Sequence, residues 1–220
     1  MTNMIIFVGG PTACGKTTFT TLLNEKIEKS IRYRRYQAFF DIANKQGIPE
    51  SEVFNQISSE AVDDWFVSVC KELGCVISDV HYAVQLGRNN NTNNNEIDIY
   101  REYVPTISKE LLEKLFESNI KVIAIYLTCA PQVCLKRAIN RYNKKEKELR
   151  IRSLVDAKLE SIAEKNEWDN IISFPNVEHL ELNTELFTTE ELVNKTLSYL
   201  SDNMKKDSQY LVLKRKINNR

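Results

Sequence analysis

The feature that most limits how this chain can fold is a group of glycines close behind an apolar run near its start. Gly9, Gly10 and Gly15 are three of only six glycines in 220 residues. The run Met4–Val8 before them is continuously apolar, which predicts a strand buried on both faces. Apolar residues at helical spacing follow the glycines, which predicts a helix that reaches Lys29. The chain therefore begins with a strand, a glycine loop and a helix.

Residues 10–17 read Gly-Pro-Thr-Ala-Cys-Gly-Lys-Thr and fit the pattern G-x-x-x-x-G-K-[ST] at every position. Such a loop turns backbone N–H groups inward, and the helix that follows adds its positive end, so the phosphates of ATP can be held there. Lys16 is predicted to reach the β- and γ-phosphates, and the Thr17 hydroxyl to bind Mg²⁺. A glycine turn that only packs would not explain a lysine at a helix N-terminus, where a cation is unfavourable. Nucleotide contacts are assigned to Gly10, Thr12, Ala13, Cys14, Gly15, Lys16, Thr17 and Thr18.

Further apolar runs alternate with amphipathic stretches along the rest of the chain. Strands are predicted at 75–79, 121–128 and 177–182, and helices at 37–47, 49–73, 107–118, 131–142 and 153–170. Thr188 and Glu191 have the spacing of a capping box, so a last helix is expected to begin there. This alternation predicts one α/β domain whose parallel sheet is covered by helices on both faces.

Three segments stand apart from this pattern. Residues 89–95 are all asparagine except Thr92 and are expected to form a loop insertion. Residues 143–152 are almost wholly charged, which fits either a solvated linker or a mobile lid. The domain is placed at 1–204, followed by a basic tail at 205–220; a frayed end is the commoner explanation for such a tail, and contact with RNA or a membrane surface the other.

Composition excludes several classes of protein. The 30 basic and 30 acidic side chains cancel, whereas a polyanion-binding protein normally carries a basic excess. No apolar run is long enough to span a bilayer, and the apolar start is too short for a secretory leader. The five cysteines form no CxxC pair and only two histidines occur, which argues against a zinc site and for reduced thiols. A cytoplasmic protein with neither a membrane nor a nucleic-acid partner is expected.

Asp79 ends the predicted strand at 75–79. In an open parallel sheet ligands sit beyond the carboxyl ends of the strands, so Asp79 is expected beside the glycine loop. A carboxylate there can hold Mg²⁺ or accept a proton from an attacking hydroxyl, and the alternative is a residue that caps a turn. His81 is expected to face the same cleft as part of the substrate site, or else to be an ordinary surface histidine.

Two sets of arginines are candidates for the charge of phosphoryl transfer. Arg137 and Arg141 are four residues apart and share one helix face. Arg150 and Arg152 lie at the end of the charged segment, from which a closing lid could deliver them. The alternative for both sets is a solvated surface.

Arginines interleaved with tyrosines follow the first helix. Arg34 and Arg35, with Tyr33 and Tyr36 beside them, could hold an anionic acceptor and stack a flat one. A nucleic-acid patch or plain surface would have the same composition. Arg101, in Tyr-Arg-Glu-Tyr, is a weaker candidate for the same substrate-binding role.

On these residues the chain resembles the P-loop kinases of small molecules, the group that contains nucleoside monophosphate kinases, shikimate kinase and gluconate kinase. Residues 10–17 match their phosphate loop, and 135–141 are similar to their arginine-bearing helix before the lid. Residues 177–183 resemble their last strand, whose following turn often lines the adenine pocket. The resemblance implies a three-layer fold with strand order 2-3-1-4-5, a lid, and transfer of the γ-phosphate of ATP with Mg²⁺.

The acceptor stays open, because the arginine that adenylate kinases carry after the acidic strand is replaced by Ala83 and the gluconate kinase acceptor motifs are missing. A GTPase is rejected, since D-x-x-G and N-K-x-D both fail. A non-catalytic nucleotide-binding switch and a tRNA prenyltransferase-like enzyme remain alternatives, and turnover of ATP separates them. We expect an ATP-dependent phosphotransferase of unknown oligomeric state that acts on a small acceptor. Its predicted catalytic residues are Lys16, Asp79, Arg137 and Arg141.

Overall fold

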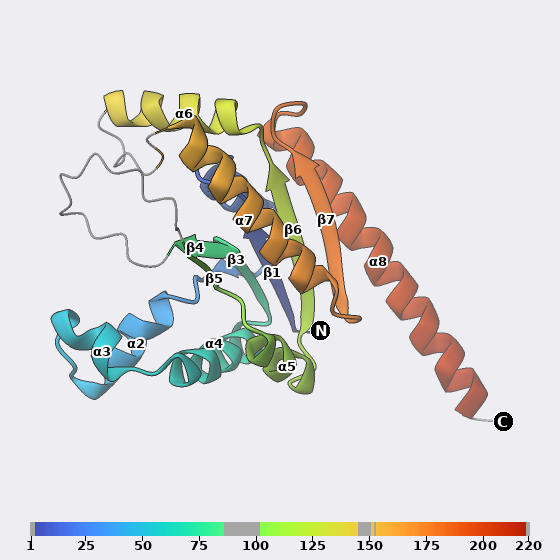
Figure 1. Cartoon of the computed structure of the whole chain (residues 1–220). Helices are drawn as coiled ribbons and strands as arrows, with labels where there is room; N and C mark the ends of the chain where they lie inside the picture. The colour runs from blue at the N-terminus through green and yellow to red at the C-terminus, as the bar shows by residue number, and fades with distance from the viewer. Residues whose placement is uncertain (1–2, 86–101, 145–150, 152, 219–220) are drawn as a thin grey trace.

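Five parallel strands form the central sheet of the computed structural model, which describes residues 3–85, 102–144, 151 and 153–218, and those from 204 onward by backbone alone. The strands lie in the order β2-β3-β1-β6-β7 (Figure 1). Counted among themselves along the chain, they have the order 2-3-1-4-5, so the predicted fold class is confirmed. Their bounds are β1 Met4–Gly9, β2 Ser30–Arg32, β3 Cys75–Asp79, β6 Lys121–Thr128 and β7 Val177–Asn183.

A second, antiparallel sheet of two strands was not predicted. It consists of β4 (Ala83–Gln85) and β5 (Tyr103–Pro105), which flank the asparagine-rich region. Each strand has only three residues, too few for an alternating pattern to stand out in the sequence. Residues 89–95 themselves lie outside the described residues. β2, also of three residues, was missed for the same reason.

Helices cover both faces of the sheet. One face carries α1 (Lys16–Lys26) and α8 (Thr189–Asn218), whose buried residues pack with Ile6, Val8 and Ile123. The other carries α4 (Ser59–Leu73), α5 (Lys109–Glu117) and α7 (Leu154–Ile172), which pack with strand residues such as Ile5 and Phe7. In Figure 1 α7 crosses the sheet at the front, and α8 lies beside β7. The strands alternate their side chains between two apolar layers, which is why each reads as an unbroken apolar run.

The predicted helix at 49–73 is wrong as a single element. A short 3-10 turn, Glu50–Glu52, leads into α3 (Val53–Gln56), and the chain is extended at Ile57 before α4. Ser58 caps α4 by accepting a hydrogen bond from the Ala61 N–H. With α2 (Gln37–Gln46) these helices enclose a small apolar core of their own at the edge of the molecule, with residues Ala38, Ile42, Ala43, Val53, Ile57 and Val62.

The remaining differences between the predicted and observed elements lie at the ends of helices. The first helix stops at Lys26 rather than Lys29, which has the left-handed φ of 62° that a helix cannot contain. The capping box is confirmed, because Thr188 and Glu191 exchange hydrogen bonds at the start of α8. The backbone of α8 continues through the basic segment to Asn218, so the expected change from domain to tail at 205 does not coincide with a helix end. α6 (Pro131–Asn143) precedes the charged segment, of which 145–150 and 152 lie outside the described residues.

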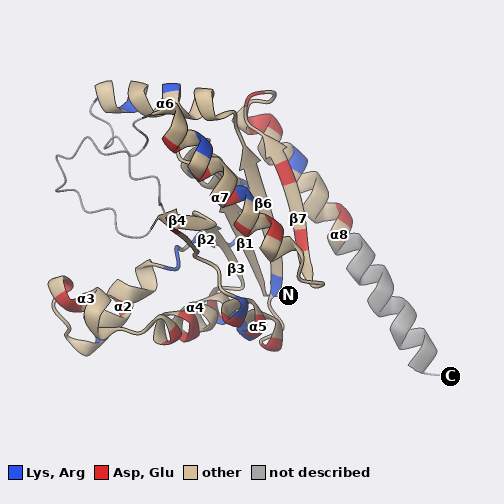
Figure 2. Ribbon diagram, viewed as in Figure 1, with Lys and Arg blue, Asp and Glu red and all other residues tan. Residues whose placement is uncertain are grey.

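The surface carries mixed charge. Figure 2 shows acidic and basic residues interspersed over the helices, with no face given to one sign in this view. All five cysteines are free thiols, as expected. Among the described residues, no helix is both long enough and apolar enough to cross a membrane.

Candidate active site

The glycine loop joins the end of β1 to the start of α1. Gly10, Ala13 and Gly15 have left-handed φ values of 136°, 66° and 112°. A Cβ on Gly10 would lie 2.4 Å from the Leu127 carbonyl oxygen, so only glycine lets the loop approach the end of β6 this closely. The loop therefore has a close-packed backbone with left-handed residues, of the kind that can present N–H groups to an anion.

Lys16 folds back over this loop. Its Nζ donates hydrogen bonds to the carbonyl oxygens of Gly10 and Pro11, the latter at 3.1 Å. The ammonium group is thereby held against the backbone of the loop. Thr18 follows on the first turn of α1, where it is exposed.

Asp79 lies beside the loop because β3 pairs with β1, with Asp79 in register with Val8. Thr17 Oγ1 donates to Asp79 Oδ2 at 3.4 Å. A hydroxyl and a carboxylate oxygen side by side are the hard oxygen ligands that Mg²⁺ prefers, so these two residues fit the cation expected there.

Two arginines from β2 and the segment after it surround Asp79. Arg34 binds the carboxylate with two hydrogen bonds, Nε to Oδ1 at 2.5 Å and Nη2 to Oδ2 at 2.6 Å, and Arg32 lies 3.6 Å away. Burial acts to raise the pKa of Asp79, but the Arg34 hydrogen bonds and the two positive charges outweigh it, so the pKa is lowered. Asp79 is therefore held as a carboxylate.

Arg35, the other predicted acceptor ligand of this segment, points to a different acid. Its Nε lies 2.5 Å from Oδ1 of Asp63, a buried residue of α4. The guanidinium groups of Arg34 and Arg35 are thus both paired with aspartates, and each ties the segment after β2 to another element.

His81 reaches two glutamates of α7 that the sequence analysis missed. His81 Nδ1 lies 2.7 Å from Glu164 Oε1 and 3.8 Å from Glu160 Oε1. Glu160 Oε1 also accepts hydrogen bonds from the phosphate loop, from the Thr12 N–H at 2.8 Å and the Thr12 hydroxyl at 2.6 Å. The structure therefore brings the loop, the end of β3 and the middle of α7 together.

Glu164 is wholly buried between these elements, and its Oε2 accepts the Tyr82 N–H at 2.8 Å. Burial raises its pKa to about 7, although the charge of Lys16 and backbone N–H groups act in the opposite direction. One signal in the sequence could have found this pair: Asp156, Glu160 and Glu164 recur every four residues, a line of acids on one helix face that is unfavourable unless it is satisfied elsewhere.

Arg137 joins the loop to the turn after β7. Its guanidinium donates to the Cys14 carbonyl at 3.4 Å and to the hydroxyl and carbonyl of Thr184, both at 3.1 Å. Arg141 lies one turn further along α6, and within the described residues no hydrogen bond or ion pair joins it to the loop. Arg101, Arg150 and Arg152 lie outside the described residues, so their predicted roles stay predictions.

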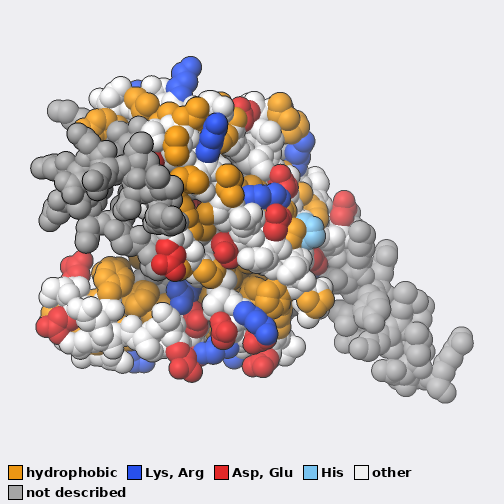
Figure 3. Space-filling view, viewed as in Figure 1, with side chains coloured by type: hydrophobic (Ala, Val, Ile, Leu, Met, Phe, Trp, Pro, Cys, Tyr) orange, Lys and Arg blue, Asp and Glu red, His pale blue; other side chains and the backbone are white. Residues whose placement is uncertain are grey.

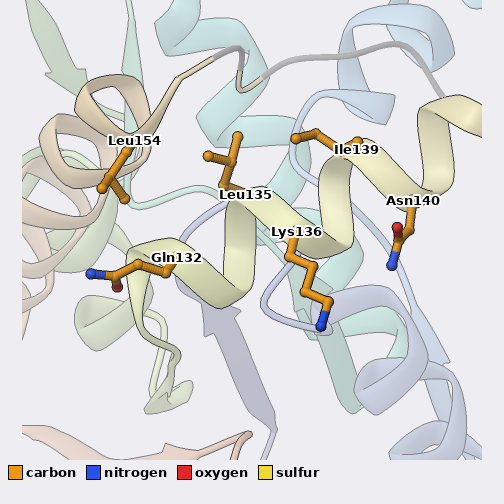
Figure 4. A pocket seen from close by; sticks show the side chains of 6 residues that line it. All are labelled: Gln132, Leu135, Lys136, Ile139, Asn140 and Leu154. Atoms are coloured by element: carbon orange, nitrogen blue, oxygen red, sulfur yellow. The ribbon is translucent and has the colours of Figure 1, made fainter.

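A shallow groove of about 270 Å³ lies elsewhere, along α6 and the start of α7 (Figure 4). Leu135, Ile139 and Leu154 provide its apolar lining, and none of the predicted site residues contributes to it. Figure 3 shows apolar side chains between charged ones on the face seen in this view. Val155 and Ile162 of α7 are among the exposed apolar residues. The groove is separate from the site around the phosphate loop.

The sequence matches no protein-family model and no curated protein. Solved structures match over almost their whole length. Shikimate kinase from Acinetobacter baumannii, in complex with shikimate, shares 16% identity at a TM-score of 0.50, over 92% of this chain and 95% of that one. The YorR protein from Bacillus subtilis, in complex with phosphorylated GDP, shares 14% at 0.51, over 92% and 98%. The tunicamycin resistance protein of Deinococcus radiodurans shares 12% at 0.51, over 90% and 95%.

The chain has the fold of the P-loop small-molecule kinases. The suspected resemblance is confirmed at the level of the fold, and identities this low carry no substrate from those proteins to this one.

Proposed function

We propose that this protein transfers the γ-phosphate of ATP to a hydroxyl group of a small molecule. The observation that carries the proposal is the set of groups around residues 10–17: a left-handed glycine loop, Lys16 folded over it, and the Thr17 hydroxyl in contact with Asp79. Together they place N–H donors, an ammonium group and oxygen ligands within one small volume, as a nucleoside triphosphate with its cation requires.

Each residue has a role in this reaction. The loop N–H groups and Lys16 bind the phosphates and stabilise the charge that spreads over the transferred group. Thr17 and Asp79 would hold Mg²⁺, which when bound neutralises charge on the phosphate oxygens. Arg137 bridges the loop and the Thr184 turn and so fixes the nucleotide end of the site.

The acceptor is placed at the end of β3. Its hydroxyl oxygen forms the new bond to the γ-phosphorus as the bond to the bridging oxygen of ADP breaks, and its proton passes to the Asp79 carboxylate. Because this transfer comes late in a loose transition state, a carboxylate with a low pKa is sufficient.

The test is acceptor-dependent release of ADP. The purified chain is first titrated with Mg-ATP and Mg-GTP in a calorimeter, and ADP release is then followed with nucleosides, nucleotides, sugars and sugar acids. We expect binding of a triphosphate, and consumption only when the acceptor is present. Binding without consumption by any acceptor would favour a nucleotide switch, and absence of binding would overturn the proposal.

A further inference from the structure

We propose that the acceptor is a hydroxyl compound without a carboxylate or phosphate group, neutral or carrying an amine, and that Glu160 determines this specificity. The inference rests on the proposed function and adds the class of substrate to it. It reverses the expectation that arginines after the first helix hold an anionic acceptor.

Glu160 lies where the acceptor must meet the phosphate. Its Oε1 is hydrogen bonded to Thr12 of the phosphate loop at 2.8 and 2.6 Å, and lies 3.8 Å from the ring of His81, two residues beyond Asp79. A residue in contact with both the loop and the end of β3 borders the gap across which a phosphoryl group passes. Its side chain is 16% exposed, so it can contact a ligand in that gap.

Within the part of the chain that the structure describes, the arginines on the opposite side are already matched. Arg34 and Arg32 form ion pairs with Asp79, and Arg35 forms one with Asp63. These arginines are therefore parts of ion pairs, and an anionic acceptor would have to take one away from a carboxylate at 2.5–3.6 Å. Separating such a partly buried pair leaves a carboxylate uncompensated, which is unfavourable.

Glu160 adds negative charge to the same volume. Lys16 faces Glu164, but its charge is required by the nucleotide phosphates once they bind. An acceptor with its own carboxylate or phosphate would then lie against Glu160 and the γ-phosphate with little water between them, and like charges at short range in a partly buried site repel strongly. A hydroxyl or ammonium group can instead donate a hydrogen bond to Glu160.

The experiment compares related hydroxyl compounds of different charge. Glucosamine, glucose and gluconate form one set, and thymidine and thymidine 3′-monophosphate, which keeps the 5′-hydroxyl, form another. The value of kcat/KM is measured for each from ADP release at saturating Mg-ATP. We expect the best neutral or amino compound to exceed every acid by at least about tenfold, since each factor of ten corresponds to only a small difference in interaction free energy.

Two variants connect this selectivity to Glu160. Glu160→Gln keeps an oxygen for the Thr12 N–H but removes the charge, and should reduce the ratio of kcat/KM between uncharged or amino acceptors and their acidic partners by about fivefold or more. Asp169→Asn is the control, because this acid lies on the opposite side of α7 and pairs with Lys165 at the surface. The ratio is unaffected by changes in nucleotide binding or in the folded fraction, which a purely structural role would alter.

The outcomes are distinguishable from failure of the proposed function. If calorimetry shows Mg-ATP binding and the acids are the better substrates, or are phosphorylated when no neutral or amino compound is, the specificity inference is wrong and the kinase assignment survives. A ratio unchanged by Glu160→Gln also overturns the role of Glu160. If Mg-ATP does not bind, both proposals fail together.

Discussion

The phosphate loop takes its shape from the consecutive residues 10–17, whereas the wall opposite it is assembled from segments up to 148 residues apart. The loop depends on local backbone geometry: left-handed glycines, a strand before and a helix after. The opposite wall depends on tertiary contacts, such as Thr12 with Glu160 and Arg34 with Asp79. The loop can therefore be recognised in the sequence as a motif, whereas the opposite wall forms only when the chain folds.

The difference between the local loop and the tertiary wall separates the part of the site that many nucleotide-binding proteins have from the part that is particular to this chain. A phosphate group is the same in every nucleotide, so a short loop suffices to bind it. Acceptors differ in shape and charge, and in our proposal the residues near the acceptor come from the end of β3, the segment after β2 and α7, where substitutions leave the loop intact. Substitutions on the two sides should therefore have different consequences for the reaction.

The largest effect is expected on the nucleotide side. Lys16→Ala removes the ammonium group proposed to bind the phosphates and should lower kcat/KM by about 10³-fold. Preorganised groups that stabilise the charge developing in the transition state are usually the largest contributors to catalysis. Lys26→Ala, at the exposed C-terminal end of α1, is the matched control and should keep full activity. Circular dichroism and thermal unfolding establish that both fold. An active Lys16→Ala protein would contradict the phosphate-binding role of the loop.

On the acceptor side, the two arginine–aspartate pairs should behave differently. Asp79→Asn removes the carboxylate beside Thr17 and should lower kcat on the order of 10²-fold. Asp63→Asn breaks the pair with Arg35 and should instead reduce the free energy of unfolding by about 1–3 kcal/mol while kcat changes by less than about threefold. Steady-state kinetics and urea unfolding on both variants provide the comparison. Equal losses of kcat would show that the pairs share one structural role.

The fold could be predicted because its longer strands and helices have enough residues to show a hydrophobic pattern in the sequence. The strands 75–79 and 121–128 appear at the predicted bounds, since burial on both faces leaves an unmistakable apolar run. β2, β4 and β5 have three residues each, and their pairing depends on partners far along the chain. The break at Ile57 in the predicted helix 49–73 was missed because its apolar spacing continues across the Ser58 cap.

The site could be predicted only as far as its motif extends. That Asp79 lies beside Thr17 and the loop could be predicted, because a loop pattern and a strand end place these residues, while their roles stay predictions. Arg34 was assigned to an acceptor, although its actual partner, Asp79, lies 45 residues further on. Glu160 and Glu164 were missed because two glutamates on a helix normally indicate a solvated surface. Their four-residue spacing was visible in the sequence, but the contacts that explain it form only when α7 packs against the loop.

Stability should be most sensitive where the two sides meet. A Cβ on Gly9 would lie 2.2 Å from the ring of Tyr82, which is fully buried and hydrogen bonded to the Ile125 carbonyl at 2.9 Å. Gly9→Ala should therefore reduce the free energy of unfolding by about 2–3 kcal/mol through overpacking. Gly47→Ala is the control: its Cβ meets nothing, and its φ of +69° should cost only about 1 kcal/mol. Urea unfolding measures the free energy of unfolding of both variants. An equal loss in the two would show that Tyr82 can move aside.

The smallest effect concerns the pH dependence of Glu164, which faces His81, Lys16 and Glu160. Its folded pKa of about 7 lies above the ordinary value of 4.5, so between these pH values the folded state binds more protons than the unfolded state. The contribution of Glu164 to stability is therefore fully present below about pH 4.5 and is lost as the pH rises to 7. Glu164→Gln keeps an acceptor for the Tyr82 N–H and removes this titration, so the stability of the variant should rise relative to the wild type by about 1–2 kcal/mol from pH 5 to pH 8. Urea unfolding at each pH measures this difference. Above about pH 8 the free energies of unfolding of the two proteins should change in parallel with pH. If they change in parallel from about pH 5 upward, Glu164 is ionised throughout, and the buried cluster holds one more negative charge.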